Sequence, residues 1–134
     1  MESKTRELLQ MLRYELNYLE QGGFRRDREA VGLQSPFLGT MICINFGDPL
    51  RRHSCQECSL HQLVPIDRQK EEFPCHHIPL NASKDTIASL IRKNDPERLE
   101  FALKGWLRAT IARLEASLEK EDKEKGESAK PPKS

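Results

Sequence analysis

Residues 94–118, NDPERLEFALKGWLRATIARLEASL, decide the fold because they predict where a long helix begins and which of its sides is buried. Asp95 is a preferred helix-capping residue, and Pro96 after it suits the first helical position. Apolar side chains then recur at spacings of one to four residues: Leu99, Leu103, Trp106, Leu107, Ile111, Leu114 and Leu118. This period predicts an amphipathic helix whose apolar side, Trp106 included, lies in the core.

A second amphipathic helix is predicted at residues 5–20 from a stripe of leucines: Leu9, Leu12, Leu16 and Leu19. Gly22-Gly23 ends it, since glycine readily adopts the left-handed conformation of a helix C-cap. The stripe needs an apolar partner, and the long C-terminal helix of the same chain supplies one. The helix from Leu9 to Leu19 would also serve a homodimer, because a short leucine seam looks alike in both cases.

The section between these helices, residues 23–81, has a different character. Prolines at positions 36, 49, 65, 74 and 79 prevent a long helix there. Met41–Phe46 is the best strand candidate, because it is apolar and partly β-branched and turn residues follow it. Ile87, Leu90 and Ile91 then mark a short helix before the break at Asn94.

The composition limits the size of the core and the kinds of partner. The chain has 134 residues, of which 37% are hydrophobic and 32% charged, so we expect one modest core. A formal net charge of +1 argues against bulk electrostatic attraction to nucleic acid or to an anionic membrane. We find no membrane span and no signal-peptide stretch, and we expect a cytoplasmic protein with reduced thiols.

Every cysteine and histidine of the chain falls between residues 43 and 77: Cys43, His53, Cys55, Cys58, His61, Cys75, His76 and His77. A shared set of metal ligands has to be gathered in this way. Cys55-Gln56-Glu57-Cys58 can place two thiolates on one zinc ion from a tight turn, and Cys75-His76-His77 follows after 16 intervening residues. We predict a Cys₃His site of Cys55, Cys58, Cys75 and His77, with one zinc ion per chain.

The fourth ligand has alternatives. His77 is preferred to His76 because alternate residues of an extended segment point the same way. His53, His61 and Cys43 are further candidates. Three other interpretations stay open: buried core thiols, a redox pair at Cys55 and Cys58, and an iron–sulfur cluster on all four cysteines.

These patterns together predict an α-rich, α+β fold. The N-terminal helix pairs with the long C-terminal helix around a loop-rich, zinc-stapled middle that contains a short strand pair. One domain covers residues 1–118, with a helix at 5–20, the metal-binding section at 23–81 and two helices at 83–118. Residues 119–134, rich in Glu, Lys, Ser and Pro, are predicted to form a disordered tail.

The predicted function is a non-catalytic interaction or regulatory module with a structural zinc site and a protein partner. Three thiolates reduce the Lewis acidity of zinc, and the His-Glu-x-x-His motif of zinc enzymes is missing from the sequence. The alternative is a metal-dependent or thiol-based enzyme or redox sensor. Nucleic-acid binding through Arg51 and Arg52 is the weakest alternative, because acidic residues offset the basic residues of this section.

Overall fold

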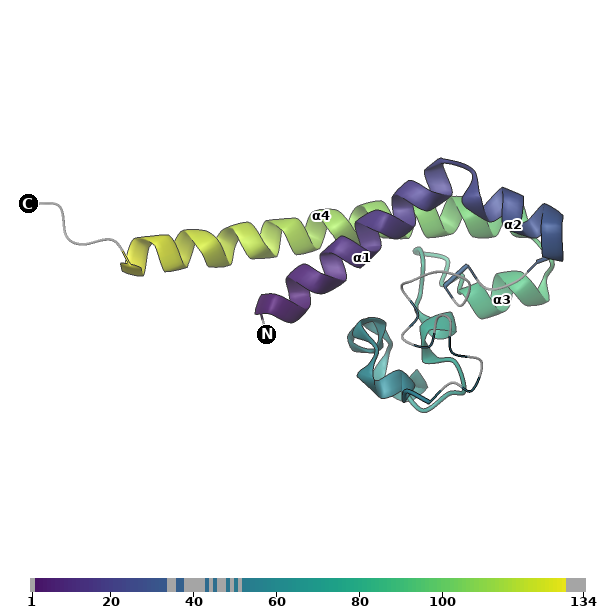
Figure 1. The fold of residues 1–134 in the computed structure, drawn as a ribbon, viewed down its shortest axis with the longest axis horizontal. Helices are drawn as coiled ribbons and strands as arrows, with labels where there is room; N and C mark the ends of the chain where they lie inside the picture. Colours follow the sequence, from purple (N-terminus) through teal and green to yellow (C-terminus); the bar gives the residue numbers. More distant parts are fainter. Residues whose placement is uncertain are drawn as a thin grey trace, which may run out of the picture.

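The computed structural model of the chain describes residues 2–33, 36, 37, 43, 45, 48, 50 and 52–129. Its elements in chain order are the α-helices and 3₁₀ helices (η) α1 (Glu2–Glu20), α2 (Gly23–Val31), η1 (Cys55–Glu57), η2 (Ser59–Leu63), η3 (Ile66–Arg68), η4 (Pro74–His77), α3 (Ile87–Arg92) and α4 (Pro96–Ala129). α1 and α4 form a long pair, with α2 and α3 near one end of it (Figure 1). The short 3₁₀ helices lie together beside this pair.

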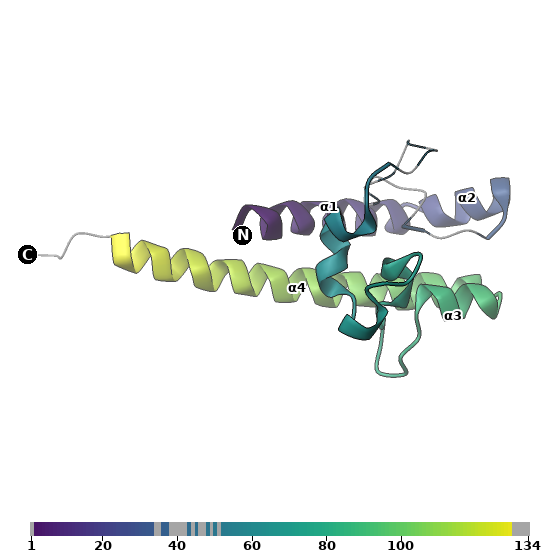
Figure 2. The same cartoon turned by 90° about the horizontal axis from the view of Figure 1, so that it is seen from below.

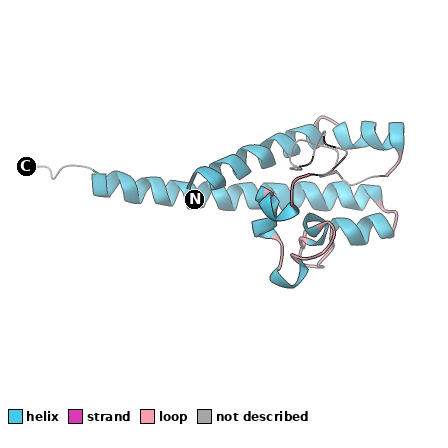
Figure 3. Cartoon of the chain, turned by 60° about the horizontal axis from the view of Figure 1, so that its bottom comes forward, coloured by secondary structure: helices cyan, strands magenta, loops and turns pink. Residues whose placement is uncertain are grey.

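The described residues contain helices and turns but no strand (Figure 3), so the predicted α+β class and its strand pair are wrong. Most of the candidate strand Met41–Phe46 lies outside the described residues. Of its members that are described, Cys43 is at a bend and Asn45 is in a turn. Prolines lack the N–H that a strand ladder needs, and the section from 52 to 80 forms tight 3₁₀ turns instead.

The predicted pairing of the N-terminal and C-terminal helices is confirmed. α1 and α4 run side by side in opposite directions (Figure 2). Two ion pairs report the same register: Arg6 lies 2.7 Å from Asp122, and Arg13 lies 3.1 Å from Glu115. Both pairs are about half exposed and contribute little to stability. The pair is held by its apolar sides, which include Leu8, Leu9, Leu12 and Leu19 of α1 and Leu99, Leu103, Leu107 and Ile111 of α4.

All parts of the described chain contribute to one core. Trp106 is 9% exposed and lies there, as predicted, with its ring centroid 6.1 Å from that of Phe37. The middle section adds Leu60, Val64, Ile78 and Leu80, and α3 adds Ile87 and Leu90. The apolar stripe of α1 is therefore occupied within a single chain.

The end of α1 follows the prediction, but the next helix was missed. Gly22 has φ +83°, a left-handed conformation, and its N–H donates to Leu19. α2 begins directly afterwards at Gly23, which the sequence analysis assigns to the loop-rich section. The hydroxyl of Tyr18 donates to Asp27 at 2.6 Å and so ties α2 back to α1. This hydrogen bond is the largest cause of a rise in the pKa of Tyr18 to about 12.

The junction between α3 and α4 confirms the predicted break at Asn94. Asn94 has φ +53°, and the N–H groups of Asn94 and Asp95 donate back to Ile91 and Leu90, which completes a Schellman motif. Asp95 then caps α4, because its side chain accepts a hydrogen bond from the N–H of Arg98 at 3.2 Å.

α4 is longer than predicted. It continues to Ala129, through residues 119–129, which the sequence analysis assigns to a disordered tail. Its yellow end projects past the beginning of α1 in Figures 1 and 2. None of the described helices is long and apolar enough to cross a membrane.

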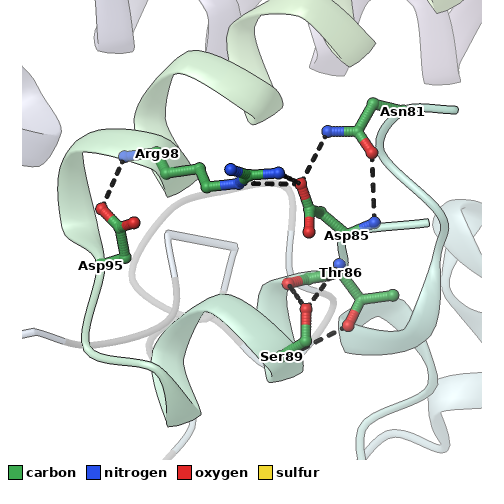
Figure 4. Close-up of polar contacts among 6 residues, drawn as sticks. All are labelled: Asn81, Asp85, Thr86, Ser89, Asp95 and Arg98. Atoms are coloured by element: carbon green, nitrogen blue, oxygen red, sulfur yellow. Dashed lines mark hydrogen bonds and ion pairs between the residues drawn. The ribbon is translucent and has the colours of Figure 1, made fainter. Parts of the chain in front are cut away.

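Asp85 joins the middle section to the helices (Figure 4). Its side chain is 6% exposed and accepts hydrogen bonds from Asn81 at 3.0 Å and from Arg98 at 3.0 and 2.8 Å. Its backbone oxygen accepts from Leu80 at 2.7 Å. The hydrogen bonds from Asn81 and Arg98 lower the pKa of Asp85 below its usual value. This network holds the segment that follows η4 against α4.

We expect Asp85→Asn to lower the Tm at neutral pH by roughly 5 °C or more, because Asn cannot replace the carboxylate that Arg98 binds. A lowered pKa means that the stabilisation is present above the unfolded-state pKa of 3.8 and is lost as the pH falls through the folded-state value. The difference from wild type should therefore shrink between about pH 5 and pH 2. Thermal unfolding followed by circular dichroism across this range measures it.

Asp67→Asn is the matched control, since Asp67 is exposed and the chemical change is the same. It should leave the Tm nearly unchanged at each pH. Equal behaviour of the two variants would contradict a stabilising role for the Asp85 network.

Candidate metal centre

Cys55 and Cys58 lie in one tight turn. η1 begins at Cys55, and the N–H of Cys58 donates to the carbonyl oxygen of Cys55 at 3.1 Å. Ser54 caps the turn by accepting a hydrogen bond from the N–H of Gln56 at 3.2 Å. Cys58 is the C-cap residue of this turn. The hydrogen-bonded turn therefore keeps the backbones of Cys55 and Cys58 close together.

Cys75 comes to this region on another element. It lies in η4, where Pro74 is the first residue, and η4 contacts both η2 and α3. Cys58 and Cys75 are both half-buried against the hydrophobic core. The two halves of the predicted ligand set are thus linked through η2, the helix that directly follows Cys58.

The Cys75 thiol is influenced by burial and by the other three cysteines. Burial raises the pKa of Cys75 to about 12, and the charges of Cys58, Cys43 and Cys55 add to the rise, in that order. Cys58, Cys43 and Cys55 therefore all contribute to the electrostatic environment of Cys75. All four are free thiols rather than disulfides.

Two of the histidines have other neighbours. His53 is exposed, and its Nδ1 lies 3.7 Å from a carboxylate oxygen of Glu57. The ring of His76 packs against Phe73, with centroids 5.2 Å apart and planes inclined by 32°. Neither contact resembles the setting of a buried metal ligand.

His77, the predicted fourth ligand, does not lie in the extended segment for which it was preferred to His76. Residues 75–77 lie in a 3₁₀ helix, so the expectation of an extended segment is wrong. Successive side chains of such a helix turn by about 120°, which separates the directions of Cys75 and His77. The Nε2 atom of His77 lies 4.0 Å from a carboxylate oxygen of Glu71.

His61 is the histidine in the most unusual environment. Its Nε2 atom is buried and has no hydrogen-bond partner among the described residues. Its backbone N–H donates to the carbonyl oxygen of Cys58 at 3.0 Å, so it follows the Cys55–Cys58 turn directly. A buried polar atom without a partner costs free energy, which a metal ion or a hydrogen-bond acceptor would recover.

The geometry stops short of a formed site. Within the described ranges, no group of three or more His, Cys, Asp or Glu side chains is spaced to hold a metal ion. The thiols are gathered in one region but do not meet at one point. Their chemistry still fits zinc, because thiolates and imidazoles are its preferred ligands and such sites commonly form together with the metal.

Asn45 is a residue of this region that the sequence analysis did not single out. It is 4% exposed and makes two hydrogen bonds to the backbone of His53. The sequence does not indicate that Asn45 binds the backbone of His53, because this contact depends on a reversal of the chain between the two residues.

Comparison of the chain with protein families, with curated proteins and with solved structures finds no match.

Proposed function

We propose that this chain is a small zinc-binding protein in which one zinc ion staples the middle section to the helical pair. Cys55, Cys58 and Cys75 supply three of the ligands. The observation that carries the proposal is that η2, which directly follows the Cys55–Cys58 turn, contacts η4, which carries Cys75, and that Cys58 and Cys75 both pack against the core. Cysteines from two separate turns of one chain can bind one zinc ion, as thiolates do in structural zinc sites.

A staple at this place has a physical purpose. The middle section contributes only a few large side chains to the core and is built from short 3₁₀ turns. Ordering each residue costs about 1–2 kcal/mol of backbone entropy, which little apolar burial is available to offset. Metal binding adds free energy that only the folded section can gain.

The role we propose is structural rather than catalytic. A catalytic zinc keeps one position for water, whereas a set of thiolates closes the site and weakens its Lewis acidity. The ordered turns then present side chains to a protein partner. Leu50 and Ile66 of this section are 76% and 88% exposed, which suits contact with another protein.

The alternative functions have less support. Cys55 begins a three-residue 3₁₀ turn, not a longer helix whose N-terminus would activate a redox thiol. Arg52, one of the two arginines considered for nucleic-acid binding, is engaged by Asp48 at 3.1 Å.

The test is the zinc content of purified, tag-free protein, measured by mass spectrometry of the elements. We expect about one zinc per chain in the wild type and a large loss in Cys55→Ser and in Cys75→Ser. His53→Ala is the control, because the exposed His53 should not be needed. His77→Ala reports whether that histidine is a ligand. A metal-free wild type that is folded and monodisperse would contradict the proposal.

A further inference from the structure

The segment that carries Cys43 is fastened to the segment that carries Cys55. The side-chain amide of Asn45 donates to the carbonyl oxygen of His53 at 3.0 Å and accepts from its N–H at 3.0 Å. These two hydrogen bonds use the backbone N–H and C=O groups of His53, as a neighbouring strand would. They close a loop between Asn45 and His53, and we call this closure the neck of the loop. Asn45 is buried, so these bonds are shielded from water.

The loop beyond the neck is cross-linked by Asp48. Its N–H donates to the carbonyl oxygen of Asn45 at 2.9 Å. Its carboxylate accepts from the N–H of Leu50 at 3.2 Å and from the N–H and Nε of Arg52 at 3.3 and 3.1 Å. These contacts stabilise the reversal of the chain between Asn45 and His53, so the two ends of the loop stay close together.

The reversal places one cysteine on each side of the neck. Cys43 precedes Asn45 by two residues, and Cys55 follows His53 by two residues. Two residues span at most about 7 Å, so the Cα atom of Cys43 lies within about 7 Å of that of Asn45, and the Cα atom of Cys55 within about 7 Å of that of His53. Cys58 closes the η1 turn that begins at Cys55, and Cys75 lies on η4, which contacts η2.

We propose that Cys43 is the fourth ligand, so that the zinc ion is held by four thiolates and by no histidine. This inference rests on the proposed zinc site. It departs from the Cys₃His set expected from the sequence, because three of the four histidines have other neighbours. His53, His76 and His77 contact Glu57, Phe73 and Glu71 respectively.

His61 then acts on the site without binding the metal. Four thiolates around Zn²⁺ carry a net charge of about −2, and N–H groups directed at the sulfur atoms stabilise such a charge. The buried Nε2 of His61 is suited to this role, since it follows Cys58 closely and has no hydrogen-bond partner in the described part of the chain. His61 is therefore a positioning residue.

The number of thiolates can be read from the wild-type protein after Co²⁺ replaces zinc. Four sulfur ligands place the visible absorption bands at longer wavelength than three sulfurs and one imidazole, because imidazole is the stronger-field ligand. We expect the four-thiolate spectrum. This measurement needs no substitution and so does not depend on whether a variant folds.

Cys43→Ser and His61→Asn separate the two candidates for the fourth position. Cys43→Ser should weaken zinc binding by more than the roughly 10- to 100-fold that loss of an outer-shell partner costs, and His61→Asn should stay within that range with an unchanged Co²⁺ spectrum. A Cys43→Ser variant that keeps its zinc and its spectrum would overturn this inference and leave the zinc site standing. A wild type without zinc would overturn both, and bound iron with visible charge-transfer absorption would replace zinc by an iron–sulfur cluster.

Discussion

Phe37→Ala is expected to lower the free energy of unfolding by about 3–5 kcal/mol. Phe37 is fully buried, and its ring lies 6.1 Å from that of Trp106 on α4. Truncation removes the transfer free energy of the ring and leaves a cavity beside Trp106. It also removes the contact by which this part of the middle section reaches the long helix. Denaturant unfolding followed by Trp106 fluorescence measures the loss.

Phe101→Ala is the matched control, because Phe101 is 82% exposed on the same helix and undergoes the same chemical change. It should alter the free energy of unfolding by less than about 0.5 kcal/mol. If both variants lost similar amounts, the position of Phe37 in the core would be wrong.

Removal of the proposed zinc ion by a chelator is expected to open residues 52–80 while α1 and α4 stay paired. Structural zinc binds small peptides with apparent free energies of about 10–16 kcal/mol, and a section that needs the metal loses that contribution. Amide hydrogen exchange read by mass spectrometry should accelerate by roughly 100-fold or more in peptides from this section, equivalent to about 2.8 kcal/mol. Peptides from the α1–α4 interface should keep their protection, because leucines hold it.

Cys55→Ser serves as the control for this experiment. Without its zinc it should already exchange quickly at residues 52–80, and the chelator should change nothing more. If the wild type released its zinc and kept its protection, the metal would have no part in ordering the section.

The helical pair was predictable because its signals are local. Asp95 and Pro96 mark the start of α4, and Gly22 marks the end of α1, through backbone preferences that no distant residue has to supply. The apolar period of three and four residues specifies the buried side of each helix. Each apolar side needs a cover, and the other helix of the same chain supplies one.

α2 and the missing strand show where local signals fail. α2 has only one large buried side chain, Phe24, so its sequence shows no apolar period that would predict a helix. The hydrogen bond from Tyr18 to Asp27 links α2 to α1, and a contact between two helices is not visible in a local pattern. At Cys43 and Asn45 the apolar character of the segment favoured a strand. The side chain of Asn45 instead takes the backbone groups of His53 that a strand would have used.

From the sequence alone we could predict two amphipathic helices that pair across one small core, and every cysteine and histidine could be placed in the section between them. The Cys-x-x-Cys spacing also predicted that Cys55 and Cys58 share a tight turn. Only the tertiary structure decided which distant residues join them. The packing of the middle section against α3 and α4 decides the burial of Asn45, the 3₁₀ turn at Cys75 and the placement of His61. Contacts between residues that are distant in the sequence cannot be predicted from a local pattern.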